Sequence, residues 1–95
     1  MVIGALVLHL QVPESVSLKS KRQVVRSLVA RLQRTFNVAV AEVGDLDLWQ
    51  SVELGVVCVS SDPRHADEIC QKVLRFVDDE AEAVLTRSSF ELVHL

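Results

Sequence analysis

Aromatic residues are scarce in this chain of 95 residues: they make up only 4% of it, and tyrosine is absent. RNA-recognition domains stack bases on aromatic side chains of the central strands of a sheet, so this shortage disfavours sheet-face readout of RNA. Glycine (3) and proline (2) are also too few for a linker or a disordered segment. We therefore expect a single domain over residues 1–95.

Long apolar runs and metal-binding spacings are lacking as well. The longest apolar run, residues 2–10, contains a histidine and stops far short of the ~20 residues of a membrane span. It also lacks the basic leader and cleavage site of a signal peptide. Cys58 and Cys70 have no second Cys or His at zinc-binding spacing, which favours buried thiols in a reducing compartment. We expect a cytoplasmic protein without membrane, metal or cofactor.

Six elements emerge from the hydrophobic periodicity. Strands are predicted over residues 2–11, 38–43, 52–59 and within 83–95, and helices over residues 18–36 and 63–79, the first capped by Ser15, Ser17 or Ser20. The order β-α-β-β-α-β is that of the α+β ferredoxin-like sandwich. It predicts a four-stranded antiparallel sheet of order 4-1-3-2 with two helices on one face.

The two faces of this sheet differ in size of side chain. The bulkier even-numbered positions of the first and third strands are predicted to lie under the helices. The opposite face is small and apolar, with Ala5, Val7, His9, Ala39, Ala41, Gly55, Val57 and Val59. An exposed apolar face favours a covering partner, most simply a second copy of the chain. Val7, Val57, Val59 and Trp49 are the candidate interface residues, with Trp49 alternatively a lid over the core.

Positive charge is concentrated in the first helix. Between Glu14 and Glu42 there is no acidic residue, and the segment carries six of the ten cations: Lys19, Lys21, Arg22, Arg26, Arg31 and Arg34. A helical wheel directs these side chains to solvent, except that Lys21 lies beside the apolar stripe. Such a face fits RNA phosphates or an acidic protein surface, and a merely solvated helix remains the alternative. Cations beside the first-turn N–H groups also suggest a phosphate site at the start of this helix.

Catalytic signatures are missing. The chain contains no G-x-S-x-G, G-x-x-x-x-G-K, G-x-G-x-x-G or H-E-x-x-H motif. Glu42, Asp45, Asp47 and Glu53 gather around the predicted hairpin, but nothing in the pattern forces two of them into one apolar pocket. We therefore expect a protein that is not an enzyme.

Four strings carry a family resemblance. They are L-K-S-K-R at residues 18–22, F-N-V-A-V-A-E at 36–42, D-L-W at 47–49 and E-L-G-V at 53–56. With them the chain resembles the YlxP-like family of uncharacterised small bacterial proteins. The resemblance implies a ferredoxin-like fold, a small cytoplasmic protein, and genes near those for translation initiation and ribosome maturation. It aligns Lys19, Lys21, Arg22, Asn37, Glu42, Asp47 and Trp49 with family positions, without any catalytic assignment.

These observations lead to two hypotheses. In the first, the protein is a non-enzymatic module that docks on ribosomal or precursor RNA through its first helix. In the second, it is a homo-oligomer, most simply a homodimer, that uses the open sheet face in a structural role or to bind a small ligand.

Overall fold

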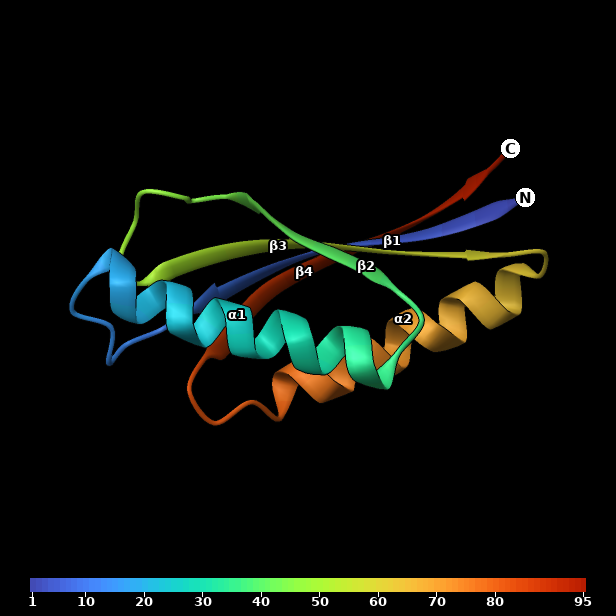
Figure 1. Ribbon diagram of the computed structural model, residues 1–95. Helices are drawn as coiled ribbons and strands as arrows, with labels where there is room; N and C mark the ends of the chain where they lie inside the picture. The colour runs from blue at the N-terminus through green and yellow to red at the C-terminus, as the bar shows by residue number, and fades with distance from the viewer.

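The six predicted elements all form, in the predicted order (Figure 1). A computed structural model describes all 95 residues. The elements are β1 (Val2–Gln11), α1 (Leu18–Thr35), β2 (Ala39–Gly44), β3 (Ser51–Ser60), α2 (Pro63–Asp78) and β4 (Val84–His94). Their ends differ from the predicted ranges by about one residue, the usual uncertainty of a helix or strand end.

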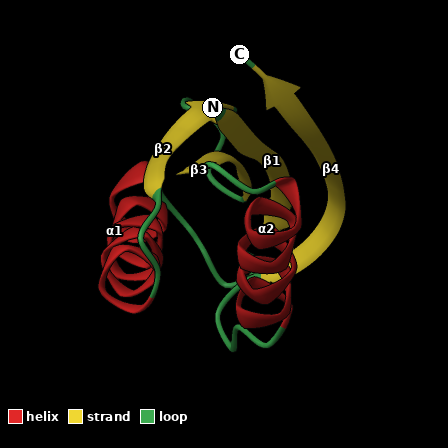
Figure 2. Ribbon diagram, turned by 90° about the vertical axis from the view of Figure 1, so that its right-hand side faces the viewer, coloured by secondary structure: helices red, strands yellow, loops and turns green.

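The strands form one antiparallel sheet of order β2-β3-β1-β4, the predicted order read from the other edge. Residue by residue, β1 pairs with β3 from Val2↔Ser60 to Gln11↔Ser51. Both helices lie on the same side of the sheet (Figure 2). The ferredoxin-like α+β fold is thereby confirmed.

The core lies between the sheet and the helices. Even-numbered residues of the central strands, such as Leu8 of β1 and Leu54 of β3, are fully buried there. The core comprises 17 buried residues, and partly buried residues of β2 and β4 pack against it. The predicted assignment of the bulky strand positions to the helix side is therefore confirmed.

Capping chemistry determines where α1 begins. Ser17 is the N-cap: its hydroxyl accepts the N–H of Ser20, and the Ser20 hydroxyl accepts the N–H of Ser17. The buried side of α1 then follows the helical period through Val25, Leu28 and Leu32.

The second helix is capped by an aspartate and begins with a proline. The Asp62 carboxylate accepts the N–H of Arg64, and Pro63 occupies a position where no N–H is needed. Helix α2 approaches β1 closely at Gly4, where a Cβ would meet the Cys70 sulfur at 2.9 Å and the Ala66 carbonyl at 3.3 Å. Neither helix is long and apolar enough to cross a membrane.

Candidate functional site

The outward side of α1 carries an exposed, purely cationic set of charges. Lys19, Arg22, Arg26 and Arg34 are all exposed, and none of them forms an ion pair. At ~100° per residue they fall within an arc of roughly 120°, opposite the buried stripe. At about 1.5 Å per residue they extend over roughly 22 Å of the helix. We call these four residues the α1 basic face.

Lys21 does not belong to this face, which corrects the prediction that grouped it with the other cations. Its side chain is fully buried, and its ammonium donates to the carbonyl of Asp45 at 2.7 Å and that of Ser51 at 3.1 Å. Glu42 Oε2 lies 2.9 Å from the same Nζ, outside hydrogen-bond geometry, so this contact is an ion pair. Since all three neighbours belong to β2, β3 and the loop between them, Lys21 ties α1 to this hairpin.

Arg31 is also engaged inside the molecule. Its guanidinium lies 2.8 Å from Glu80 Oε2, and the Glu80 side chain is only 8% exposed. The Arg31 Nε also donates to the carbonyl and hydroxyl of Ser27 at 3.3 Å. This pair joins α1 to the segment after α2, so Arg31 is less available to a ligand than the four residues of the α1 basic face.

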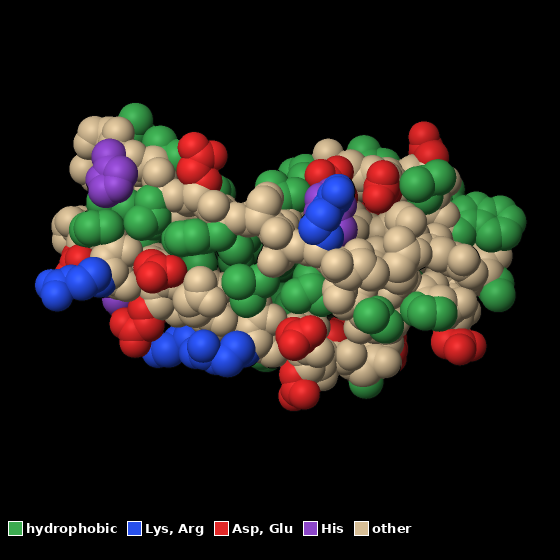
Figure 3. Space-filling model, turned by 180° about the vertical axis from the view of Figure 1, so that it is seen from behind, with side chains coloured by type: hydrophobic (Ala, Val, Ile, Leu, Met, Phe, Trp, Pro, Cys, Tyr) green, Lys and Arg blue, Asp and Glu red, His purple; other side chains and the backbone are tan.

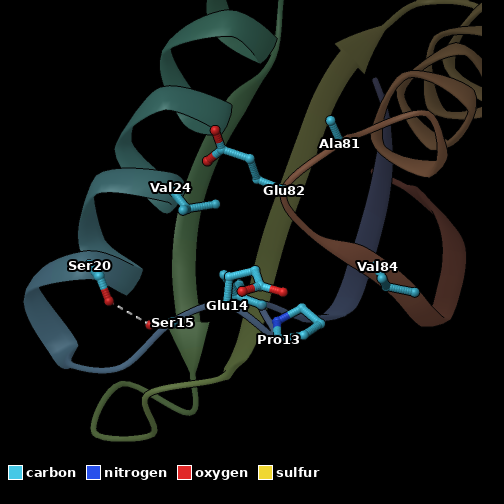
Figure 4. A pocket seen from close by; sticks show the side chains of 9 residues that line it. Pro13, Glu14, Ser15, Ser20, Val24, Ala81, Glu82 and Val84 are labelled. Atoms are coloured by element: carbon cyan, nitrogen blue, oxygen red, sulfur yellow. Dashed lines mark hydrogen bonds between the residues drawn. The ribbon is translucent and has the colours of Figure 1, made fainter.

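The first turn of α1 is a poor phosphate site. The capping box already occupies the N–H of Ser20, and the neighbouring cavity of about 450 Å³ is lined by the acidic residues Glu14 and Glu82. Figure 4 shows these two side chains lining the cavity with Val24, and the hydrogen bond between Ser15 and Ser20 beside them. Two carboxylates repel an anion, so the basic residues along the helix are better placed for phosphate than its N-terminus.

The sheet face opposite the helices is open, as predicted, and it includes three of the candidate interface residues. Val57 is 39% exposed and Val59 62% exposed, and Val7 is half-buried between them and β4. Seen from behind, the molecule shows hydrophobic side chains over much of its middle (Figure 3). Trp49 lies in the β2–β3 loop with 56% exposure, so its alternative role as a lid over the core is wrong.

One polar cluster lies on this open face. His9 of β1 stands between β3 and β4, with its Nε2 3.7 Å from Glu53 Oε1 and 3.3 Å from a guanidinium nitrogen of Arg87. The Glu53 carboxylate lies directly over Gly44, where any side chain would collide with it. His94 is paired with Val2 at the opposite end of the sheet, so the histidines do not meet.

The two cysteines lie buried side by side as free thiols, with their sulfurs in a hydrogen bond 4.0 Å long and no disulfide between them. Burial, together with the neighbouring Cys58, raises the pKa of the Cys70 thiol to about 12. A thiol that stays protonated is a weak nucleophile, so neither the pair nor its position suggests thiol chemistry. Among the described residues, no group of three or more His, Cys, Asp or Glu side chains could hold a metal ion.

Sequence reasoning missed the partners of the two engaged cations. A signal for the first was present: Lys21 falls on the apolar stripe of the helix, and Glu42 occupies a helix-side position of β2, two residues after Val40. No comparable local signal links Arg31 to Glu80, because Glu80 lies in the segment after α2, far from Arg31 in the sequence.

Comparison with known proteins places the chain in a family. Over 76 residues it is 38% identical to the uncharacterized protein YlxP of Bacillus subtilis (strain 168), an alignment that covers 78% of this chain and 83% of that protein. Residues 3–90 match the family described as "Protein of unknown function (DUF503)". These matches confirm the resemblance to YlxP-like proteins, and the chain belongs to the DUF503 family.

Proposed function

We propose that this protein is a non-enzymatic module that binds structured ribosomal or precursor RNA in the cytoplasm through the α1 basic face. The observation that carries the proposal is the exposure of Lys19, Arg22, Arg26 and Arg34 on one side of a helix without any intramolecular acid to neutralise them. Cations left unpaired in this way keep their full attraction for a polyanion.

The distribution of charge supports a defined binding orientation. Residues 15–41 contain no acid, whereas the rest of the chain holds all 13 acidic residues against four cations. An RNA would therefore be attracted to α1 and repelled by most other surfaces. The molecule can bind a polyanion despite a net charge of -3.

The types of side chain favour phosphate contacts rather than base readout. Three of the four residues are arginines, whose planar guanidinium group binds a phosphate through two parallel hydrogen bonds. The central strands offer no aromatic platform on the open face, where β1 and β3 carry aliphatic residues, a glycine and the polar residues His9, Gln11, Ser51 and Glu53. We therefore expect recognition of the shape and phosphate backbone of a folded RNA with little sequence preference.

Fluorescence anisotropy with labelled ribosomal RNA fragments tests the proposal. The variant Lys19→Glu/Arg26→Glu should reduce affinity at least tenfold at low salt. The control Arg64→Glu/Lys72→Glu makes the same change in net charge on α2, where both side chains are more than half exposed, and should bind nearly as well as the wild type.

Two outcomes would exclude this function. One is absence of binding at about 50 mM salt, where phosphate contacts are strong. The other is an equal loss in both double variants, which would reflect net charge alone. An acidic protein captured from a nuclease-treated lysate by the wild type and not by the α1 variant, with no RNA binding, would assign the basic face to a protein partner instead.

A further inference from the structure

The open face of the sheet has a regular pattern across its two central strands. The residues that pair there are Ile3 with Val59, Ala5 with Val57, Val7 with Gly55 and His9 with Glu53. In the last three pairs the two partners differ in size or in charge. A small residue faces a valine in two of them, and an imidazole faces a carboxylate in the third.

This pattern is self-complementary under a two-fold rotation. The axis we consider runs parallel to the strands, in front of the open face and midway between β1 and β3. Rotation about it would lay each β1 residue over a β3 residue of the second copy, namely the one with which it pairs in its own sheet. Val7 would then lie over the partner's Gly55, against the Val43 side chain that packs over that glycine, and Val57 would meet the partner's Ala5. We propose that the open face is the interface of a two-fold symmetric dimer of this chain with this axis.

Two shallow grooves lie on either side of the proposed axis. A groove of about 240 Å³ runs over β2 and β3 along Ala41, Val43 and Gly55, and one of about 150 Å³ lies over β1 and β4 between Ala5 and Ser89. The rotation lays each groove over the other groove of the second copy, with Val57 over the partner's Ala5 at the border. The proposed fit therefore depends on the central strands β1 and β3 rather than on these grooves.

The charged residues at one end of the open face would be complementary between the two copies. Across the sheet at the level of His9 the order is Gly44, Glu53, His9, Arg87. The rotation reverses this order in the second copy, so that His9 lies over the partner's Glu53. Arg87 then lies over the partner's Gly44, which the partner's Glu53 carboxylate covers. Each acid would gain basic neighbours from the other subunit, and no acid would face an acid at this level.

The size of the face reaches what a specific dimer needs. Four strands at ~4.8 Å spacing and about eight residues at ~3.3 Å give a footprint of roughly 500 Å² per subunit. Two such footprints come to about 1,000 Å², the lower bound for a specific interface. The α1 basic face lies on the helix side of the sheet and stays free, so the dimer is independent of the proposed RNA binding.

Analytical ultracentrifugation over a concentration series tests the dimer. The wild type should sediment at twice the monomer mass of 10.6 kDa. Val57→Arg should give a monomer, while Val16→Arg, a matched change at a valine that is 76% exposed in the β1–α1 loop, should leave the dimer intact. A wild type that is monomeric at every concentration overturns the proposal. So does a dimer that survives Val57→Arg, because it would form elsewhere, for example through a sheet edge.

A mixing experiment tests the axis itself. In His9→Glu the new carboxylate would lie over the partner's Glu53, and in Glu53→Lys the new ammonium would lie over the partner's His9, so each variant alone should dimerise poorly. In a mixture the new acid and the new base face each other, and a heterodimer should form at least tenfold more tightly than either homodimer. With both variants folded by circular dichroism, failure of the mixture to form this heterodimer overturns the proposed axis.

Discussion

Removing the buried ammonium of Lys21 should destabilise the fold strongly. In Lys21→Met the hydrophobic stem is retained, but Glu42 keeps a carboxylate that is only 17% exposed, and the carbonyls of Asp45 and Ser51 lose their donor. Breaking a buried ion pair from one side costs about 3–5 kcal/mol. Because Glu42 retains some access to water, we expect the lower end, about 3 kcal/mol.

Urea unfolding followed by circular dichroism measures this loss as a lower midpoint at unchanged slope. For a domain of this size, a loss of about 3 kcal/mol corresponds to a fall in Tm of roughly 12–24 °C. The control Lys19→Met removes an exposed ammonium two residues earlier in the same helix and should change stability by less than about 0.5 kcal/mol.

A double-mutant cycle shows whether the ion pair is the cause. Lys21→Met/Glu42→Leu replaces both charges by apolar groups of similar size, which removes the stranded carboxylate. The double variant should therefore be more stable than Lys21→Met alone, with a coupling energy of about 1–3 kcal/mol. A cost below about 1 kcal/mol for Lys21→Met, or strict additivity in the cycle, would refute this account of Lys21.

Two further predictions concern α2 and its contact with the sheet. Folding raises the pKa of the Cys70 thiol from 9.0 to about 12, so the unfolded chain loses this proton first as the pH rises. The protonated thiol should therefore contribute fully to stability below pH 9, and this contribution should be lost between pH 9 and about 12. Urea unfolding at a series of pH values measures the loss, which Cys70→Ala should abolish. Gly4→Ala should cost about 1–3 kcal/mol in urea unfolding, because the added Cβ meets the Cys70 sulfur at 2.9 Å and a helix carbonyl that cannot move aside, whereas Ala5→Ser on the open face should cost little.

The fold could be predicted because its signals are local and mutually consistent. Strand alternation and helical periodicity each identify which side of an element is buried, and Pro63 and Ser17 mark where the helices begin. The same alternation predicted the open face, since odd-numbered residues of β1 and β3 had to point away from the helices.

The candidate site was only partly predictable because counting charges says nothing about their partners. Lys21 and Arg31 carry the same positive charge as Arg22, yet one is buried against Glu42 and the other is bound to Glu80. Those contacts depend on which turn of α1 lies over which residue of the β2–β3 hairpin and of the segment after α2. Sequence periodicity does not specify that register. The exposure of Trp49 likewise depends on the path of a loop that has no periodic pattern.

The salt dependence of RNA binding tests the central claim most directly. With four phosphate contacts from α1, the logarithm of the binding constant should fall against the logarithm of salt concentration with a slope of about -3 to -4. Lys19→Glu/Arg26→Glu should make that slope shallower by about 2, while Arg64→Glu/Lys72→Glu should leave it unchanged. A slope near zero in the wild type, or one that the α1 substitutions do not alter, would contradict binding through the α1 basic face.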